Sequence, residues 1–297
     1  MVDVDHVIHV RDLRMSYGRR SILDGLDLDV HKGELFGLLG PNGAGKTTTI
    51  EVLEGHRRRT AGSVRVLGRD PQRDDAAWRA RIGIVLQSSR DHGRWRVGEL
   101  LGHFARYYAD PWDPAELLRR VGLTAQADQS ASTLSGGQRR RLDVAMGIVG
   151  RPELLFLDEP TTGFDPEARR DFHDLLRELR DERGMSIVLT THDMSEAQQL
   201  ADRIGVLQAG RVTAHGTLDE LTAHARSQSE VTWMAEGTQQ RQRTADPSEL
   251  VWQLHQKFDG PVPGLEVRRP SLEDVYLGMI SEGRARTPAD TAHKEAQ

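Results

Sequence analysis

Three short segments carry residue types that could act together on a phosphate-bearing substrate. They are Gly40-Pro41-Asn42-Gly43-Ala44-Gly45-Lys46-Thr47, Leu134-Ser135-Gly136-Gly137-Gln138 and the pair Asp158-Glu159. Where side chains are absent, consecutive backbone N–H groups can curl around phosphate oxygens, and a following helix adds partial positive charge from its amino terminus. The first segment fits the pattern G-x-x-x-x-G-K-[ST], in which the lysine reaches the outer phosphates and the hydroxyl binds Mg²⁺. It therefore predicts a site for a nucleoside triphosphate with Mg²⁺.

The acidic pair follows an apolar run, residues 154–157, that is typical of a buried strand. Asp158 at the strand end is suited to hold the metal through its water shell, and Glu159 can polarise the attacking water. Two adjacent acids at a strand end are otherwise costly to bury. We therefore predict that Lys46 and Glu159 are catalytic and that Thr47 and Asp158 are ligands of Mg²⁺.

A second glycine-rich motif has no use beside a complete phosphate loop unless it serves another nucleotide. Residues 134–138 therefore indicate two chains that share two ATP molecules. The same five residues could instead be only a helix cap, because Ser135 and the glycines suit the start of a helix. Arg139-Arg140-Arg141, which follows the motif, is interpreted as a solvated, phosphate-proximal helix face and not as a nucleic-acid patch.

The hydrophobic pattern predicts an α/β protein in which these motifs lie at the ends of strands. Residues 7–17 and 23–30 alternate apolar and polar side chains, as half-exposed antiparallel strands do. Residues 34–39 form a continuous apolar strand that runs into the glycine loop, and residues 46–54 then indicate a helix. The further predicted elements are a pair of strands at 63–67 and 82–86, a helical stretch at 97–121, strands at 154–157 and 186–190, and helices at 166–183 and 194–201. This alternation of strand and helix favours a mostly parallel sheet.

The pattern changes near residue 221, where polar sequence rich in Gln and Ser begins. Strand-like residues 230–235, helix-like residues 247–258 and residues 264–268 predict a separate small α+β domain. We expect a catalytic domain at 1–220 with a helical insert at about 88–150, an accessory domain at 221–280 and a disordered tail at 281–297.

Composition excludes several classes of partner and site. Lys and Arg number 40 against 45 Asp and Glu, for a net charge of −5, so no large positive field is available to hold nucleic acid. The lack of cysteine excludes disulfides and thiolate chemistry. Residues 1–6 do not resemble a secretory leader, and apolar runs such as 35–39 are far shorter than the roughly 20 residues that span a bilayer. We therefore expect the protein to stay inside the cell, and any membrane role must come from a partner.

From Val7 to Gly216 the chain resembles the nucleotide-binding subunits of ATP-binding cassette (ABC) transporters. Residues 134–138 are identical to that family's signature, which by resemblance closes over the γ-phosphate of ATP held on the opposing subunit. The resemblance implies a P-loop NTPase core with an antiparallel β subdomain and a helical subdomain, and a head-to-tail homodimer, or a pair with a similar cassette, that binds ATP and Mg²⁺. The implied ATP-binding residues are Tyr17, Gly40, Pro41, Asn42, Gly43, Ala44, Gly45, Lys46, Thr47, Thr48, Gln87, Leu134, Ser135, Gly136, Gly137, Gln138 and Asp165.

There are four weaker family markers, and the first three have an ordinary structural interpretation as well. Gln87 resembles the glutamine that contacts Mg²⁺ and passes motion to the membrane subunit, although surface glutamines are common. His192 resembles the catalytic switch histidine at the γ-phosphate, although a lone histidine is usually structural. Tyr17 resembles the aromatic residue that stacks on adenine, although an aromatic residue near a strand end usually belongs to the core. Gly163-Phe164-Asp165 resembles the loop that crosses the dimer interface, with phenylalanine where leucine is commoner.

The end of the chain carries a further resemblance. Residues 270–277 resemble the closing motif of the small carboxy-terminal domain on drug-exporter ATPases of the daunorubicin-resistance type. Ser271 is also a good helix cap, and Leu272, Val275 and Tyr276 make an ordinary apolar helix face. Import ATPases of the maltose type carry longer carboxy-terminal barrels, which this tail does not match.

The resemblance implies an ATPase whose hydrolysis opens an ATP-bound dimer and drives export of a drug, antibiotic or lipid-like compound through a separate membrane-spanning permease. The helical insert, entered through Gln87, is expected to dock on cytoplasmic loops of that permease. The resemblance therefore implies a peripheral protein on the cytoplasmic side of the cell membrane. The alternatives are an importer ATPase and a soluble ATPase that acts on nucleic acid, although the latter usually carries two cassettes or long coiled-coil insertions. A regulatory subunit without turnover is disfavoured because every expected catalytic position is filled.

Overall fold

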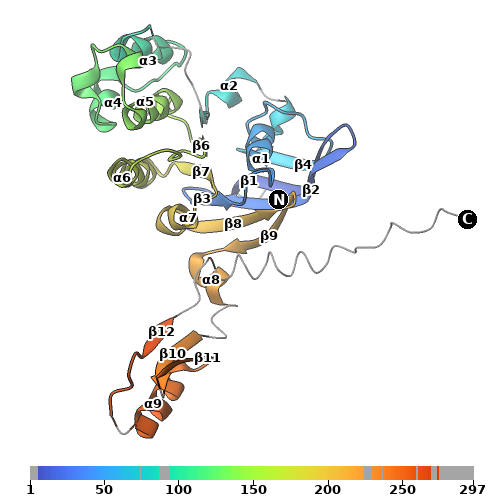
Figure 1. Ribbon diagram of the computed structural model, residues 1–297. Coiled ribbons are helices and arrows are strands. Elements are labelled where there is room, and N and C mark those ends of the chain that lie inside the picture. Colours follow the sequence, from blue (N-terminus) through green and yellow to red (C-terminus); the bar gives the residue numbers. More distant parts are fainter. Residues whose placement is uncertain are drawn as a thin grey trace, which may run out of the picture. The chain divides into compact units, whose positions relative to one another are not determined.

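The computed structural model describes residues 6–73, 75–86, 94–223, 229–235, 237–258, 260–268 and 273, and Figure 1 shows it as a ribbon. The chain divides into two compact units, Met1–His215 and Gly216–Gln297. Gln87, all of the exporter-type motif except Glu273, and the tail 281–297 lie outside the described residues. In the part of the chain that is described, no helix is long and apolar enough to cross a membrane.

A six-stranded sheet with strand order β5-β6-β7-β3-β8-β9 forms the centre of the first unit. Its strands are β5 (Ile82–Val85), β6 (Leu154–Asp158), β7 (Ser186–Thr191), β3 (Leu35–Leu39), β8 (Arg203–Gln208) and β9 (Arg211–Gly216). The pairs from β5 through to β8 are all parallel. The carboxyl ends of β3, β6 and β7 therefore meet at one edge, which is where ligands bind in parallel sheets of this kind.

An antiparallel sheet of order β2-β1-β4 accompanies it, with β1 (His6–Tyr17), β2 (Arg20–His31) and β4 (Ala61–Val66). The sequence pattern predicts a pair of strands at 63–67 and 82–86, but the structure places the two in different sheets. The first pairs with β1 and the second with β6. Periodicity identifies a strand without identifying its partner, which explains the difference.

Helices cover the central sheet and form a separate group between β5 and β6 in sequence. Figure 1 shows α3 (Val97–Ala105), α4 (Pro114–Arg120) and α5 (Gly136–Ile148) gathered together as the predicted helical insert. The other helices are α1 (Lys46–Leu53), α2 (Ala76–Arg79), α6 (Pro166–Arg183) and α7 (Met194–Leu200), with 3₁₀ turns at Pro71–Arg73, Thr124–Gln126 and Ala131–Thr133. Aspartate caps followed by proline start α4 and α6, as helix-start chemistry favours. The α/β fold predicted from the sequence is confirmed.

Two buried cores lie on opposite faces of the central sheet. On β6, Leu155 and Leu157 join the core shared with the helical insert and α6, whereas Leu154 and Phe156 join the core shared with α1 and the antiparallel sheet. Side chains alternate between faces along a strand, so a strand buried on both faces is apolar at successive positions. Asp158, which ends this strand, and Glu159, which follows it, are therefore held at the end of a strand packed between two layers.

The second unit is a small α+β arrangement of α8 (Leu218–Ala223), β10 (Ser229–Ala235), β11 (Thr238–Thr244), α9 (Pro247–Phe258) and β12 (Glu266–Arg268). Its antiparallel sheet has the order β11-β10-β12, and its core contains Val231, Leu250, Leu254 and Val262. Strand β11 was not predicted, because its sequence is polar throughout and six of its seven residues are exposed. An edge strand of this kind carries no hydrophobic period from which it could be identified.

Candidate functional site

The glycine loop between β3 and α1 folds tightly against its neighbours. Gly45 caps α1 with φ 108°, a left-handed conformation that favours glycine, and a Cβ there would lie 2.8 Å from Leu23 Cδ2. A Cβ on Gly40 would lie 2.5 Å from the carbonyl oxygen of Leu207. Side chains at these two positions would therefore distort the loop that the sequence predicts to hold phosphates.

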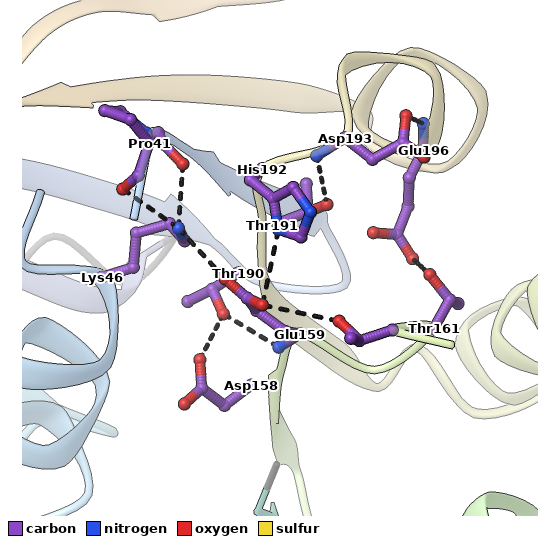
Figure 2. Close-up of polar contacts among 12 residues, drawn as sticks. Pro41, Lys46, Asp158, Glu159, Thr161, Thr190, Thr191, His192, Asp193 and Glu196 are labelled. Carbon is purple, nitrogen blue, oxygen red and sulfur yellow. Dashed lines mark hydrogen bonds and ion pairs between the residues drawn. The ribbon is translucent and has the colours of Figure 1, made fainter. Parts of the chain in front are cut away.

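Lys46 lies where this loop meets the predicted catalytic acid. Its side chain is 5% exposed, and its Nζ donates to the carbonyl oxygens of Gly40 at 2.8 Å and Pro41 at 3.3 Å. The same Nζ lies 3.2 Å from Glu159 Oε1, as Figure 2 shows. A single buried ammonium group therefore connects the phosphate loop to the end of β6.

The carboxylate of Asp158 is oriented by two hydroxyl groups from other segments. Thr47 Oγ1 donates to one carboxylate oxygen at 3.0 Å, and Thr190 Oγ1 donates to the other. One carboxylate beside one hydroxyl suits Mg²⁺, which takes oxygen ligands and usually keeps several waters and substrate phosphates. The described residues contain no cluster of three His, Cys, Asp or Glu for a metal held by protein alone. The donor set thus fits a metal shared with phosphate, and the ligand roles of Thr47 and Asp158 stay predictions.

Glu159 stands in a strained backbone conformation with φ 43°. Its N–H donates to the carbonyl oxygen of Thr190 at 3.2 Å and to Thr190 Oγ1 at 3.0 Å, and its Oε2 lies 3.4 Å from His192 Nδ1. Burial acts to raise the pKa of Glu159, but the hydrogen bond and charge of Lys46, with His192, outweigh it and lower that pKa. The carboxylate is therefore ionised at neutral pH, as a group that orients an attacking water must be.

Two of the weaker markers, His192 and Tyr17, have different surroundings in the structure. His192 is half exposed and lies beside Glu159, so its position is compatible with the predicted switch role. Tyr17 ends β1 with 45% of its surface exposed, and the Arg57 guanidinium lies 5.0 Å from its ring centroid. The interpretation of Tyr17 as a core residue is therefore wrong, and its stacking on adenine stays a prediction.

The signature motif is a helix cap in its own chain. Ser135 Oγ accepts from the backbone N–H of Gln138 at 3.3 Å, and Gln138 Oε1 accepts from the N–H of Ser135 at 3.0 Å, which is a complete capping box. Ser135 and Gly136 are exposed. Within the described residues, no hydrogen bond or ion pair joins residues 134–138 to Lys46 or the acidic pair. The structure therefore keeps this motif apart from the phosphate loop of the same chain.

Asp165 also begins a helix, since its carboxylate accepts from the N–H groups of Glu167 at 3.0 Å and Ala168 at 2.8 Å at the start of α6. It is exposed, and its proposed contact across a dimer interface stays a prediction. Gln87 lies outside the described residues. The last described residue before it is Leu86, whose carbonyl oxygen accepts a hydrogen bond from Arg140.

The predicted solvated arginine face is wrong for Arg140. This residue is 6% exposed, and its guanidinium donates to the carbonyl oxygen of Leu86 and, at 3.0 Å, to that of Asp158. Burial lowers the pKa of Arg140, and nearby acids oppose that shift. Arg139 and Arg141 instead form ion pairs with acids on α5 and α6. Successive helix residues point about 100° apart, so three adjacent arginines cannot share one face.

A buried polar contact that the sequence did not indicate lies beyond Glu159. Thr161 Oγ1 donates to Glu196 Oε1 at 2.7 Å, and His173 Nε2 lies 3.6 Å from the same oxygen. All three residues are at most 3% exposed. Figure 2 shows Thr161 and Glu196 beside the site. The contact links the segment after the acidic pair to α7, and no spacing in the sequence indicates it because three separate elements contribute.

Known proteins resemble the chain over most of its length. The family described as ABC transporter matches residues 23–162. The chain is 37% identical to a daunorubicin resistance ATP-binding protein of Streptomyces coeruleorubidus, over 94% of this chain and 98% of that protein. It is 38% identical to a Nod factor export ATP-binding protein of Cupriavidus metallidurans, over 92% of this chain and 97% of that protein. A solved ATP-binding subunit of an ABC transporter has the same fold, with a TM-score of 0.69 at 23% identity over 92% of this chain and 99% of that one.

Arg140→Met is expected to weaken the use of Mg²⁺ in ATP hydrolysis. The substitution leaves the carbonyl oxygens of Leu86 and Asp158 without their donor, and groups that orient a metal ligand typically change metal affinity or activity about 10–100-fold when removed. In a Mg²⁺ titration of the ATPase rate, the half-maximal Mg²⁺ concentration should rise by about tenfold for Arg140→Met. The value for Arg140→Lys should lie between those of Arg140→Met and the unsubstituted protein.

Arg141→Met is the matched control, because Arg141 lies one residue further along α5 and pairs with Asp171 on α6, away from the carbonyl oxygens of Leu86 and Asp158. Its titration should superimpose on that of the unsubstituted protein. Equal Mg²⁺ titrations for Arg140→Met and Arg141→Met would show that the buried guanidinium does not position the metal ligand.

Proposed function

The chain is an ATPase subunit of the ABC transporter family, and we propose that two copies bind MgATP between them. In this proposal the pair drives export of a small molecule through a separate permease. One observation carries the proposal. Lys46, Asp158, Glu159 and His192 converge at one sheet edge, while the exposed signature motif makes no polar contact with them inside the described chain. A second subunit that presents its own signature completes the site.

The roles within one site follow from the contacts. Lys46 supplies positive charge for the outer phosphates, and His192 supplies a polar nitrogen beside Glu159. Thr47 and Asp158 would hold Mg²⁺, which neutralises charge on the phosphates. Glu159, ionised and fixed by Thr190, orients the attacking water.

The dimer is held together by the nucleotide in this proposal. Each signature motif begins a helix of 13 residues, α5, whose amino terminus favours negative charge such as the γ-phosphate of the partner's ATP. Hydrolysis removes these shared phosphate contacts, so the dimer opens. Opening and closing then drive the permease.

Motion has a physical route from the nucleotide to the helical insert. Arg140 on α5 donates to the carbonyl oxygens of Leu86, which precedes Gln87, and of Asp158 on β6. One buried guanidinium therefore joins the helical insert to both segments. A displacement of α5 relative to β6 must break or carry along these contacts. The insert is therefore the part of the subunit that we expect to dock on cytoplasmic loops of the permease.

Export is favoured over import by the relatives. The matched proteins from Streptomyces and Cupriavidus are described as serving daunorubicin resistance and Nod factor export, and this chain covers nearly their whole length. The carried compound is therefore proposed to be a drug, an antibiotic or a lipid-like molecule, and the subunit to lie at the cytoplasmic face of the membrane. An importer role is the second candidate, and a role on nucleic acid is disfavoured by the net charge of −5.

Glu159→Gln is expected to keep ATP binding and to lose hydrolysis by about 10²–10⁴-fold, the usual effect of removing a positioned base. Because ATP persists, the variant should elute as a dimer with MgATP on size-exclusion chromatography. Glu167→Gln, at an exposed position in the first turn of α6, should hydrolyse ATP normally. Full turnover by Glu159→Gln would remove this residue from its assigned role.

Mixing two inactive variants tests whether each site is shared. Lys46→Ala disables the phosphate loop, and Gly136→Asp places a negative charge where no atom lies within 4 Å of an added Cβ. A mixed dimer retains one intact site, so an equal mixture should recover up to about a quarter of the normal rate for a two-fold symmetric pair.

The control for this mixture combines Lys46→Ala with a chain carrying both substitutions, which leaves no intact site and should stay inactive. Should the first mixture also stay inactive although both variants fold, or should turnover be independent of protein concentration, the shared site is wrong.

Export is tested in cells that express the chain together with the permease with which it copurifies. Accumulation of a fluorescent anthracycline should fall in cells with the unsubstituted pair and should return to the level of empty cells with Glu159→Gln. Uptake that requires an added solute-binding protein would instead favour the importer.

A further inference from the structure

A cavity of about 620 Å³ lies at the edge of the central sheet opposite to the catalytic acids. Lys32, Arg81, Glu153 and Met185 line it, and they lie shortly before the first residues of β3, β5, β6 and β7, respectively. These parallel strands run from this edge to the edge that holds Lys46 and the acidic pair. The cavity is therefore distinct from the nucleotide site.

Three parts of the first unit meet at this cavity. Its apolar lining includes Val7 from β1 of the antiparallel sheet, Leu179 from α6, Met185 from the start of β7, and Trp112 and Ile148 from the helical insert. Small-molecule sites usually measure roughly 300–1,000 Å³, are mostly apolar and often lie where domains meet. The cavity has the size, the lining and the location of such a site.

The charged residues at the cavity are mostly cationic. Arg81 makes two hydrogen bonds to the carboxylate of Glu153, at 2.5 and 3.0 Å, so these two charges compensate each other. Arg151 pairs with Asp110 at 3.2 Å, but the side chain of Asp110 is 82% exposed, and such pairs are weak. Lys32 is exposed, and within the described residues it has no hydrogen bond and no ion pair. Positive charge from Lys32 and Arg151 therefore lies beside an apolar interior.

One wall of the cavity is a fixed aromatic ring. Trp112 is 4% exposed, and the guanidinium groups of Arg120 and Arg151 lie 4.7 and 5.0 Å from its ring centroid. A ring held in this way keeps its orientation, because two cation–π contacts and the surrounding core restrain it. An apolar wall with cations at its border suits a molecule that has an apolar body and one acidic group.

Two elements connect the cavity to the nucleotide site. Strand β6 begins next to Glu153 at the cavity and ends at Asp158. Helix α5 carries Arg140 near its start and ends at Ile148, which lines the cavity. Arg140 donates to the carbonyl oxygen of Asp158, so the two elements are also joined at the catalytic edge. A molecule in the cavity would contact both elements and restrain α5 relative to β6.

We propose that this cavity binds a small organic anion, with its apolar body against Trp112 and Ile148 and its acidic group at Lys32, and that the bound molecule slows ATP hydrolysis. Charge complementarity selects this occupant: Lys32 and Arg151 would repel a cationic compound, and a neutral one would gain nothing from their charges. Hydrolysis slows because the molecule holds α5 and β6 in one relative position. The inference goes beyond the proposed function and needs only the ATPase activity of the family.

Binding is tested on the full chain with 8-anilinonaphthalene-1-sulfonate, whose fluorescence rises in apolar surroundings, and with N-phenyl-1-naphthylamine, which lacks the sulfonate. Lys32→Gln should weaken binding of the sulfonate probe by about tenfold, the usual effect of losing a hydrogen bond to a charged group, and should leave the neutral compound unaffected. Lys257→Gln, at an exposed lysine of α9 that does not line the cavity, is the matched control and should change neither affinity.

The lack of cysteine in the chain allows the charge to be removed and returned at one position. Lys32→Cys should bind the sulfonate probe about tenfold more weakly. Attachment of an aminoethyl group to the introduced thiol returns the cation and should restore the affinity, whereas a sulfonatoethyl group should weaken binding further. Thermal unfolding of both modified proteins should match that of the unsubstituted chain, because position 32 is exposed. Equal affinities of the two modified proteins would overturn the proposal.

Regulation is tested by the ATPase rate at increasing concentrations of the sulfonate probe. Saturating probe should slow the unsubstituted chain by about fivefold or more, within the usual range of coupling between sites. Lys32→Gln should need about tenfold more probe for half of the effect, in line with its weaker binding. Bound probe without any change in the rate would refute the regulatory role. Displacement of the probe by MgATP would locate it in the nucleotide site and overturn the whole proposal.

Discussion

The site depends on how the end of β6 is fixed. Asp158 receives hydrogen bonds on its two carboxylate oxygens from Thr47 on α1 and Thr190 on β7, and on its carbonyl oxygen from Arg140 on α5. These donors come from three elements that are far apart in the sequence, and none of them is charged except the buried arginine. A displacement of α1, β7 or α5 therefore changes the position of one carboxylate. Under the proposed function, a small motion at the nucleotide would reach the helical insert through this convergence, because packed elements respond as units.

Prediction from the sequence succeeded where a motif is local. The strand, loop and helix at residues 34–54 and the strand that ends in Asp158 each show a pattern within a few residues, so the spacing carries the information. The helix cap at Ser135 was only the alternative interpretation of the signature, and the structure shows that cap. Prediction failed where the partner is distant. Arg140 was assigned to solvent because a run of arginines is usually exposed. Its burial depends on the carbonyl oxygens of Leu86, just after β5, and of Asp158 on β6, which no pattern around residue 140 specifies. The contact between Thr161 and Glu196 was missed for the same reason.

Several residues serve the fold and the proposed chemistry at once. Ser135 and Asp165 cap α5 and α6, and the same two residues belong to the segments that are proposed to face a second subunit. A cap fixes the first turn of a helix, so it also fixes where that helix directs its amino-terminal N–H groups. The structural and the functional interpretations of the signature are therefore compatible. The capping geometry fixes the start of α5, as the proposed recognition of a phosphate across an interface would require.

Glu159 shows why strain is found at this position. A glycine could adopt φ 43° with little strain but has no carboxylate, whereas a side chain in such a region costs about 1–3 kcal/mol. The two hydrogen bonds from its N–H to Thr190 oppose that cost, and Thr190 also orients Asp158. One threonine thus holds the backbone of one acid and the carboxylate of the other. Because the two acids are fixed together by the fold, their charges would be arranged in advance for the metal and the water of the proposed function, which is how preorganised sites stabilise a transition state.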